Sequence, residues 1–87
     1  MSIALITGAT SGFGKAIAIK LAMNGWDIII TGRRQARLHQ LMTEIQASFS
    51  TKVLKLCFDI RNKDEVHNAI SSLPPEWKSI DVLVNNA

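Results

Sequence analysis

Four short apolar runs alternate with longer helix-forming stretches along this chain, and this alternation constrains the fold more than any other feature. The runs lie at residues 2–7, 27–31, 53–58 and 80–84. The order β-α-β-α-β-α-β predicts an α/β fold whose parallel strands are joined by right-handed helical crossovers. It matches the start of a doubly wound sheet, with strand order 3-2-1-4 and the fourth strand at an open edge.

Local signals place the ends of the helices. Phe13, Ile17 and Leu21 recur every four residues and predict one shared face of the first helix. Gly25 suits the left-handed position that ends this helix. The polar cluster that begins at Asn62 predicts the cap of the third helix.

Length and composition exclude several classes of protein. The 87 residues are 47% hydrophobic and 20% charged, as in one globular domain with no room for a second. A net charge of +3 is too small to indicate nucleic acid. Cys57 is the single cysteine, no residues have metal-ligand spacing, and no apolar run approaches the ~18 residues of a membrane span. We therefore expect a cytoplasmic protein without metal, nucleic-acid or membrane partners.

A glycine-rich turn between the first strand and the first helix is the strongest functional signal. It reads Gly8, Ala9, Thr10, Ser11, Gly12, Phe13, Gly14. Glycines let the backbone approach a pyrophosphate, and the unpaired amides at a helix start attract its charge. The spacing G-x-x-x-G-x-G departs from the G-x-G-x-x-G fingerprint, but the strand before it and the helix after it favour a dinucleotide site over a purely structural turn.

A nucleoside triphosphatase loop competes for the same residues, because Gly14-Lys15 resembles the end of G-x-x-x-x-G-K-[ST]. That pattern needs glycine at position 9 and a hydroxyl at position 16, and both positions hold alanine. We keep this function as a remote alternative.

The end of the second strand predicts which dinucleotide binds. An acid about 20 residues after the glycines normally binds the ribose 2′-hydroxyl of NAD. No Asp or Glu occurs between residues 28 and 43, and Arg33 and Arg34 stand there instead. Because guanidinium groups bind phosphate through paired, charge-assisted hydrogen bonds, the sequence predicts NADP.

Three segments together resemble a known family. Residues 7–14, Asp59 after the third strand, and Asn85-Asn86-Ala87 after the fourth are similar to the N-terminal signatures of the short-chain dehydrogenases/reductases. Residues 31–38, 72–77 and 80–87 resemble the subgroup of NADP-dependent 3-hydroxy acid dehydrogenases, which includes serine 3-dehydrogenase. The resemblance covers nearly the whole chain.

This resemblance implies a Rossmann domain that binds NADP. Gly8 to Phe13 would line the pyrophosphate and adenosine, with Thr10 or Ser11 and Arg33-Arg34 around the 2′-phosphate. Asp59 and Ile60 would contact the adenine, and Asn86 would lie beside the cofactor. Without the resemblance, Asp59 is about as readily explained as a polar strand terminator.

The family chemistry transfers a hydride between nicotinamide and a carbinol or carbonyl carbon, using Tyr, Lys and Ser residues from a later part of the fold. This chain has no tyrosine, so we assign it no catalytic residue. We expect residues 1–87 to be a partial NADP-binding domain, truncated after strand four, of an oxidoreductase. The resemblance implies a homotetrameric parent that acts on a small 3-hydroxy acid or another alcohol or carbonyl substrate. A non-catalytic dinucleotide-binding or interaction module remains the alternative.

Overall fold

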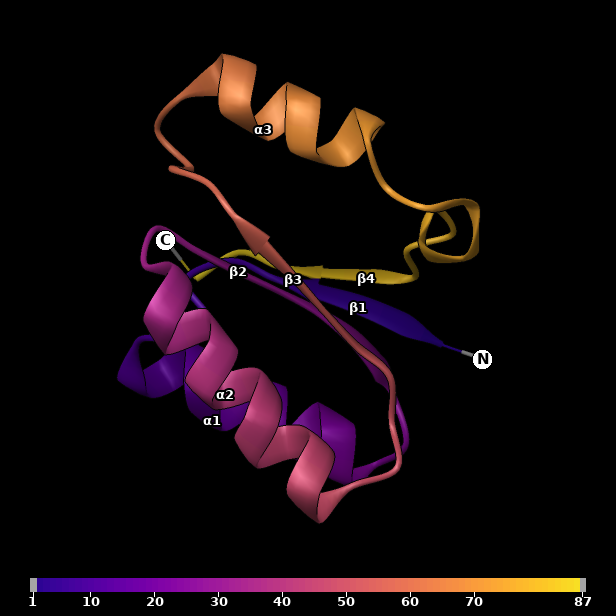
Figure 1. The fold of residues 1–87 in the computed structure, drawn as a ribbon. Coiled ribbons are helices and arrows are strands. Elements are labelled where there is room, and N and C mark those ends of the chain that lie inside the picture. The colour runs from indigo at the N-terminus through magenta and orange to yellow at the C-terminus, as the bar shows by residue number, and fades with distance from the viewer. Residues whose placement is uncertain (1, 87) are drawn as a thin grey trace.

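A computed structural model describes residues 2–86 and confirms the predicted alternation of strands and helices (Figure 1). The elements, in chain order, are β1 (Ile3–Ile6), α1 (Gly12–Met23), β2 (Asp27–Gly32), α2 (Gln35–Ser48), β3 (Val53–Cys57), α3 (Lys63–Ser71), the 3-10 helix η1 (Pro75–Trp77) and β4 (Val82–Val84).

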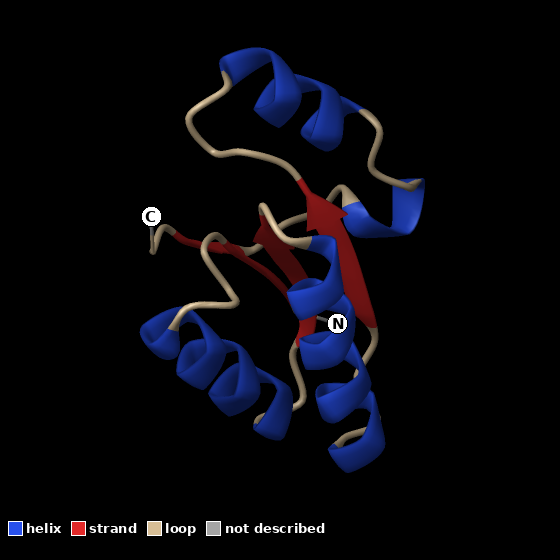
Figure 2. Ribbon diagram, turned by 60° about the vertical axis from the view of Figure 1, so that its left-hand side comes forward, coloured by secondary structure: helices blue, strands red, loops and turns tan. Residues whose placement is uncertain are grey.

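The sheet has four strands in the order β3-β2-β1-β4, and every pairing is parallel, as predicted. Ile6 pairs with Ile30 on one side and with Val84 on the other, so the carboxyl ends of the two central strands meet β4 at one edge. Helices α1 and α2 cover one face of the sheet, and α3 lies over the other (Figures 1 and 2). This is the doubly wound arrangement.

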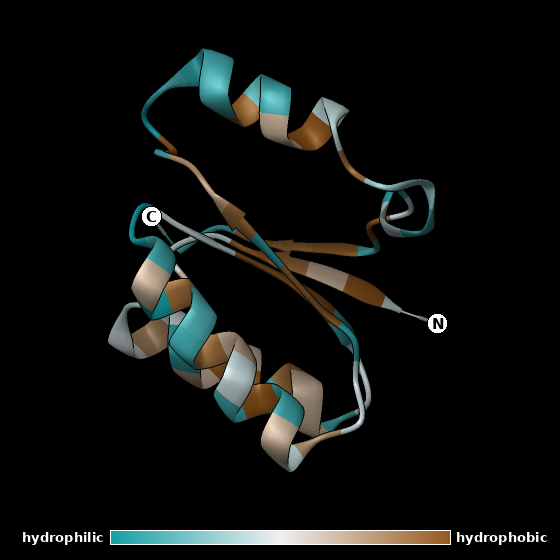
Figure 3. Ribbon diagram, viewed as in Figure 1, coloured by the Kyte–Doolittle hydropathy of each residue, from teal (hydrophilic) through white to brown (hydrophobic). Residues whose placement is uncertain are grey.

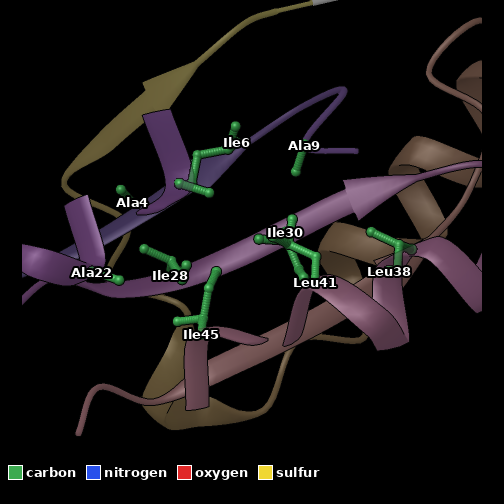
Figure 4. Close-up of a cluster of buried hydrophobic side chains, with 10 residues drawn as sticks. Ala4, Ile6, Ala9, Ala22, Ile28, Ile30, Leu38, Leu41 and Ile45 are labelled. Atoms are coloured by element: carbon green, nitrogen blue, oxygen red, sulfur yellow. The ribbon is translucent and has the colours of Figure 1, made fainter. Parts of the chain in front are cut away.

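Two apolar clusters hold the layers together. β1 and β2 are buried along nearly their whole length because helices lie over both faces of the sheet. The cluster under α1 and α2 contains Ile6, Ile30 and Leu38 (Figure 4). The smaller cluster on the opposite face joins Leu5 and Ile29 to side chains that follow α3.

The row of apolar residues predicted to share one face of α1 is only partly buried, since Ile17 and Leu21 pack against the core cluster at its side. The buried residues of α1 are Gly14, Ala18 and Ala22, whereas Phe13 is 79% exposed. The row 14-18-22 lies next to the row 13-17-21 on the helix surface, and both repeat every four residues. The small residues of the row 14-18-22 are the fully buried ones of α1, and the larger Ile17 and Leu21 pack against the core beside them.

Helix α3 begins as predicted, because the side chain of Asn62 accepts hydrogen bonds from the amides of Asp64 and Glu65 at 3.1 and 3.2 Å. Its apolar residues lie on the side that faces the sheet (Figure 3), although none of its residues is fully buried. η1, which the sequence analysis did not predict, buries Trp77 after α3. Within the described residues, no helix is long and apolar enough to cross a membrane.

Candidate cofactor-binding site

A cleft of about 360 Å³ opens at the carboxyl ends of the strands. This edge lies where the chain turns from the β1-β2-β3 side of the sheet to β4, which is the usual position of a ligand in open α/β sheets. The cleft is lined by Gly8, Thr10, Ser11, Thr31, Gly32, Arg33, Phe58, Asp59, Ile60, Arg61 and Asn86.

At two positions of the turn, Gly8 and Gly14, the surrounding backbone leaves no room for a side chain. Gly8 has a φ of +59°, and a Cβ atom there would overlap the carbonyl oxygen of Asn86. A Cβ atom on Gly14 would overlap the carbonyl oxygen of Gly8 and lie 2.8 Å from Asn86 Nδ2. The turn after β1 therefore packs directly against the residues that follow β4.

Hydrogen bonds fix the same contact. Asn86 Nδ2 donates to Ser11 Oγ at 2.8 Å and to the Gly8 carbonyl at 3.3 Å. The Ser11 hydroxyl in turn donates to the Gly8 carbonyl at 2.8 Å and caps α1. Behind them, the Asn86 amide donates to Thr7 Oγ1 at 2.8 Å, and this hydroxyl lies 3.1 Å from Asn85 Oδ1. These hydrogen bonds join the glycine turn to the residues after β4 at the floor of the cleft.

Gly12 differs from the other two glycines of the turn. It is the first residue of α1, and a Cβ atom there would meet nothing within 4 Å in the described part of the chain. The fold of residues 2–86 therefore places no steric demand for glycine at this position. An anionic group approaching the amides at the start of α1 would supply one.

The other predicted residues of the turn have different positions. Ala9 is fully buried, and its amide donates to the Thr31 carbonyl at 3.0 Å, which ties the turn to β2. Thr10 lines the cleft. The exposed side chain of Phe13 is not among the described residues that line it.

At the end of β2, Gly32 and Arg33 line the cleft. Arg34 is the exposed residue before α2 and is not among the cleft-lining residues of the described chain. Within residues 2–86, no side chain caps the start of α2. The first amides of this helix have no partner within the helix itself, and they follow Arg33 and Arg34 directly in the chain.

Across the cleft, Asp59 and Arg61 form an ion pair. Arg61 Nε donates to Asp59 Oδ1 at 3.1 Å, and Arg61 Nη2 donates to Oδ2 at 3.0 Å. The Arg61 amide adds a third bond to Oδ1 at 2.9 Å. These hydrogen bonds, helped by the charges of Arg61 and Arg33, lower the pKa of Asp59 to about 2. The carboxylate is therefore ionised at neutral pH.

The cleft thus brings together seven of the predicted residues: Gly8, Thr10, Ser11, Arg33, Asp59, Ile60 and Asn86. Sequence analysis missed Thr31, Gly32, Phe58 and Arg61. The contact of Arg61 had one usable signal, since an aspartate side chain often accepts a hydrogen bond from the amide two residues later. Whether each of these residues binds a cofactor stays a prediction.

Lys15 argues against the triphosphatase alternative. Its ammonium group lies 3.3 Å from Glu44 Oε2, on the side of α1 that faces α2. Lys15 is also not among the described residues that line the cleft next to Gly8 and Ser11. A lysine that binds the phosphates of a nucleoside triphosphate would have to point into that cleft.

Comparison with known sequences agrees with this geometry. The profile of the short chain dehydrogenase family matches residues 2–87. This chain belongs to the short-chain dehydrogenase family. Because the family profile spans both the glycine turn and the asparagines after β4, it includes the two segments that the hydrogen bonds of Asn86 join.

Among curated members of the short-chain dehydrogenase family, the chain is 46% identical over 85 residues to an NADP-dependent 3-hydroxy acid dehydrogenase of Salmonella typhi, covering 98% of this chain and 33% of that protein. It is also 46% identical to the serine 3-dehydrogenase of Agrobacterium fabrum, covering 95% of this chain and 32% of that protein. The chain therefore spans about a third of the length of these relatives.

Solved structures also match this chain over nearly its whole length. L-sorbose reductase from Gluconobacter frateurii, complexed with NADPH and L-sorbose, superposes with a TM-score of 0.92 at 34% identity, over 99% of this chain and 33% of that one. Serine dehydrogenase from Escherichia coli gives a TM-score of 0.88 at 42% identity, over 98% of this chain and 37% of that one.

Proposed function

We propose that this chain is the N-terminal, cofactor-binding part of an NADP-dependent oxidoreductase. The reaction is hydride transfer between the nicotinamide and an alcohol or carbonyl carbon of a small substrate. Membership of the short-chain dehydrogenase family supports the reaction class, and the names of two relatives, one NADP-dependent and one a serine 3-dehydrogenase, support the cofactor and a serine-like 3-hydroxy acid.

The observation that carries the choice of NADP over NAD is the side chain at the end of β2. Arg33 lines the cleft there, at the position where a carboxylate would bind the 2′-hydroxyl of NAD. Among the described residues that line the cleft, the acidic one is Asp59, and its carboxylate is paired with Arg61. A 2′-phosphate therefore meets a guanidinium at β2 instead of a repelling charge.

The chain's own residues divide the work of binding. Gly12 and the first amides of α1 hold the pyrophosphate, Arg33 and the uncapped start of α2 hold the 2′-phosphate, and Asp59 with Ile60 holds the adenine. Asn86 keeps the glycine turn in shape through its bonds to Gly8 and Ser11. When bound, the nicotinamide would accept the hydride from an alcohol carbon or donate it to a carbonyl carbon, and the acid and base of the reaction belong to the rest of the protein.

The proposal extends to the assembly and location of the full-length protein. The family resemblance implies a homotetramer, which sedimentation equilibrium would test. The single Cys57 leaves no internal disulfide in this segment and agrees with a reducing cytoplasm, which cell fractionation would test.

Titration calorimetry on the full-length protein tests the cofactor. Arg33→Ala should weaken NADPH binding by about 1.5–3 kcal/mol, the contribution of a hydrogen bond to a charged group, and leave NADH binding unchanged. Lys20→Ala removes an exposed cation at the far end of α1 and serves as the matched control. An equal loss of affinity for NADPH and NADH, or no loss for either, would contradict the assignment of Arg33 to the 2′-phosphate.

A further inference from the structure

A second cavity, of about 390 Å³, lies at the amino end of β2, opposite the cofactor cleft. Asp27, the first residue of β2, lines it together with Ala22 and Met23 at the end of α1 and with residues 48–51, which end α2 and follow it. Within the described chain, the cofactor cleft and this cavity have no lining residue in common. The two are therefore separate sites.

Asp27 places a carboxylate in this cavity without a cation beside it. The residue is only 6% exposed. Oδ1 accepts a hydrogen bond from the Lys52 amide at 3.0 Å, whereas within residues 2–86 Oδ2 accepts none and no cationic side chain forms an ion pair with the carboxylate. Aspartate is rarely buried so deeply unless it is paired, because removal of a charge from water costs free energy that a partner must offset. A bound cation would be such a partner.

The hydroxyl group of Thr51 also lacks a partner at this cavity. Its Oγ1 atom is buried and makes no hydrogen bond within the described residues. Thr51 directly precedes Lys52, whose amide binds Asp27, so the hydroxyl and the carboxylate belong to the same side of the cavity. Because buried polar groups are nearly always hydrogen-bonded, an unpaired hydroxyl beside a cavity indicates a missing polar partner. A ligand with several N–H donors would satisfy both residues.

The ends of two helices add negative potential to the cavity. α1 ends at Met23 and α2 ends at Ser48, and the last carbonyl groups of a helix carry a partial negative charge. The last turn of α2 has no basic residue, and Lys20 in the last turn of α1 is not among the described residues that line the cavity. The electrostatics therefore favour a cation over an anion.

The size and lining of the cavity indicate which kind of cation fits. A divalent metal ion needs several oxygen ligands, and within the described residues no group of three acidic, histidine or cysteine side chains could hold one. The volume is more than ten times the space of one water molecule, about 30 Å³. Met23 and Phe49 add apolar surface to the lining. These properties suit an ammonium group on a short alkyl chain.

We propose that this cavity binds a primary alkylammonium compound, whose ammonium group donates hydrogen bonds to Asp27 Oδ2 and Thr51 Oγ1 while its alkyl chain lies against Met23 and Phe49. The inference does not depend on the proposed function, because the site shares no lining residue with the cofactor cleft among the described residues. The ammonium compound and NADPH therefore bind at the same time, at opposite ends of β2.

The test uses n-butylammonium chloride as the probe and n-butanol, which has the same alkyl chain without the charge, as the comparison. Ligand-observed NMR titrations of the full-length protein, at an ionic strength held constant with KCl, measure both affinities. The wild type should bind n-butylammonium at least about tenfold more tightly than n-butanol, the lower limit for a hydrogen bond to a charged group. Saturating NADPH should leave the affinity for n-butylammonium unchanged.

Three variants locate the binding. Asp27→Asn keeps an acceptor for the Lys52 amide but removes the charge, and it should weaken n-butylammonium binding at least about tenfold. Thr51→Val removes a hydroxyl that has no partner in the described structure, so it should fold at least as stably as the wild type and weaken binding about threefold or more. Asp81→Asn is the matched control, since its carboxylate accepts the Ile3 amide at 2.9 Å but is exposed and lies outside the described cavity lining.

Equal affinity of the wild type for n-butylammonium and n-butanol would overturn the inference. So would wild-type affinity in Asp27→Asn or in Thr51→Val, an equally large loss in Asp81→Asn, or displacement of n-butylammonium by NADPH. If Asp27→Asn does not fold, Thr51→Val decides the question, because this variant keeps the carboxylate of Asp27 and its bond to the Lys52 amide.

Discussion

Replacing Gly12 with alanine should separate folding from cofactor binding. In the described structure the new methyl group meets nothing within 4 Å, and positive φ is recorded for Gly8 and Gly25 but not for Gly12. A Gly→Ala change at a compatible position stabilises a protein by about 0.4–1 kcal/mol, because it restricts the unfolded chain. For a protein about three times as long as this chain, as the relatives are, this corresponds to a rise in melting temperature of about 1–4 °C.

The same variant should bind NADPH poorly. The methyl group would keep the pyrophosphate away from the amides at the start of α1, and loss of one such bond costs about 1.5–3 kcal/mol, or roughly 10–150-fold in Kd. Thermal unfolding of the cofactor-free protein and titration calorimetry with NADPH measure the two effects. Gly14→Ala is the contrasting variant, because its methyl group would overlap the Gly8 carbonyl and should destabilise the protein by about 1–3 kcal/mol. Wild-type NADPH affinity in Gly12→Ala would refute the placement of the pyrophosphate.

The remaining predictions concern three other positions. Asn86→Ala should lower both the free energy of unfolding and the affinity for NADPH, because it removes the hydrogen bonds to Gly8 and Ser11. Denaturant unfolding and titration calorimetry measure these two quantities, and wild-type values of both would contradict the prediction. Asn62→Ala should cost about 1 kcal/mol of unfolding free energy through loss of the α3 cap, with cofactor affinity unaffected. The pKa of Asp59, followed by carboxyl carbon NMR, should lie at about 2 and rise toward 3.8 in Arg61→Gln.

The direction of the Asp59 shift also sets its pH dependence. A folded-state pKa below that of the unfolded chain stabilises the fold above the unfolded value of 3.8, and this contribution is lost as the pH falls toward about 2. Stability that depends on Arg61 should therefore change in this acidic window and stay constant near neutrality. An effect of Arg61→Gln on the pH dependence of unfolding between pH 6 and 8 would contradict this explanation.

Much of the architecture was predictable because the strands of a doubly wound sheet are short apolar runs with strong turn signals. The strand order and the cap at Asn62 follow from such local patterns. The buried face of α1 was not predictable in the same way, since the rows that begin at Phe13 and Gly14 have the same period. The close contact between Gly14 and the Gly8 carbonyl places the small row innermost, with Ile17 and Leu21 partly buried beside it.

The residues of the cleft also differ in how far the sequence predicts them. Gly8 and Asn86 could be placed in it because they end strands that lie side by side, and the carboxyl ends of parallel strands meet at one edge of a sheet. The ion pair of Arg61 with Asp59 depends on the conformation of the loop after β3, and no periodic sequence pattern predicts that conformation. Arg34, adjacent in sequence to Arg33, leaves the cleft because the chain begins to coil into α2 there.

The contact between Asn86 and the glycine turn has a consequence for the order of folding. Gly8 and Ser11 lie 78 and 75 residues from Asn86 in the sequence, and all the helices and strands except β1 lie between them. Contacts of such long sequence separation form late, because the entropy of closing the intervening loop must be overcome first. During synthesis the glycine turn leaves the ribosome well before β4, yet it would acquire its final shape only after β4 had followed and paired with β1.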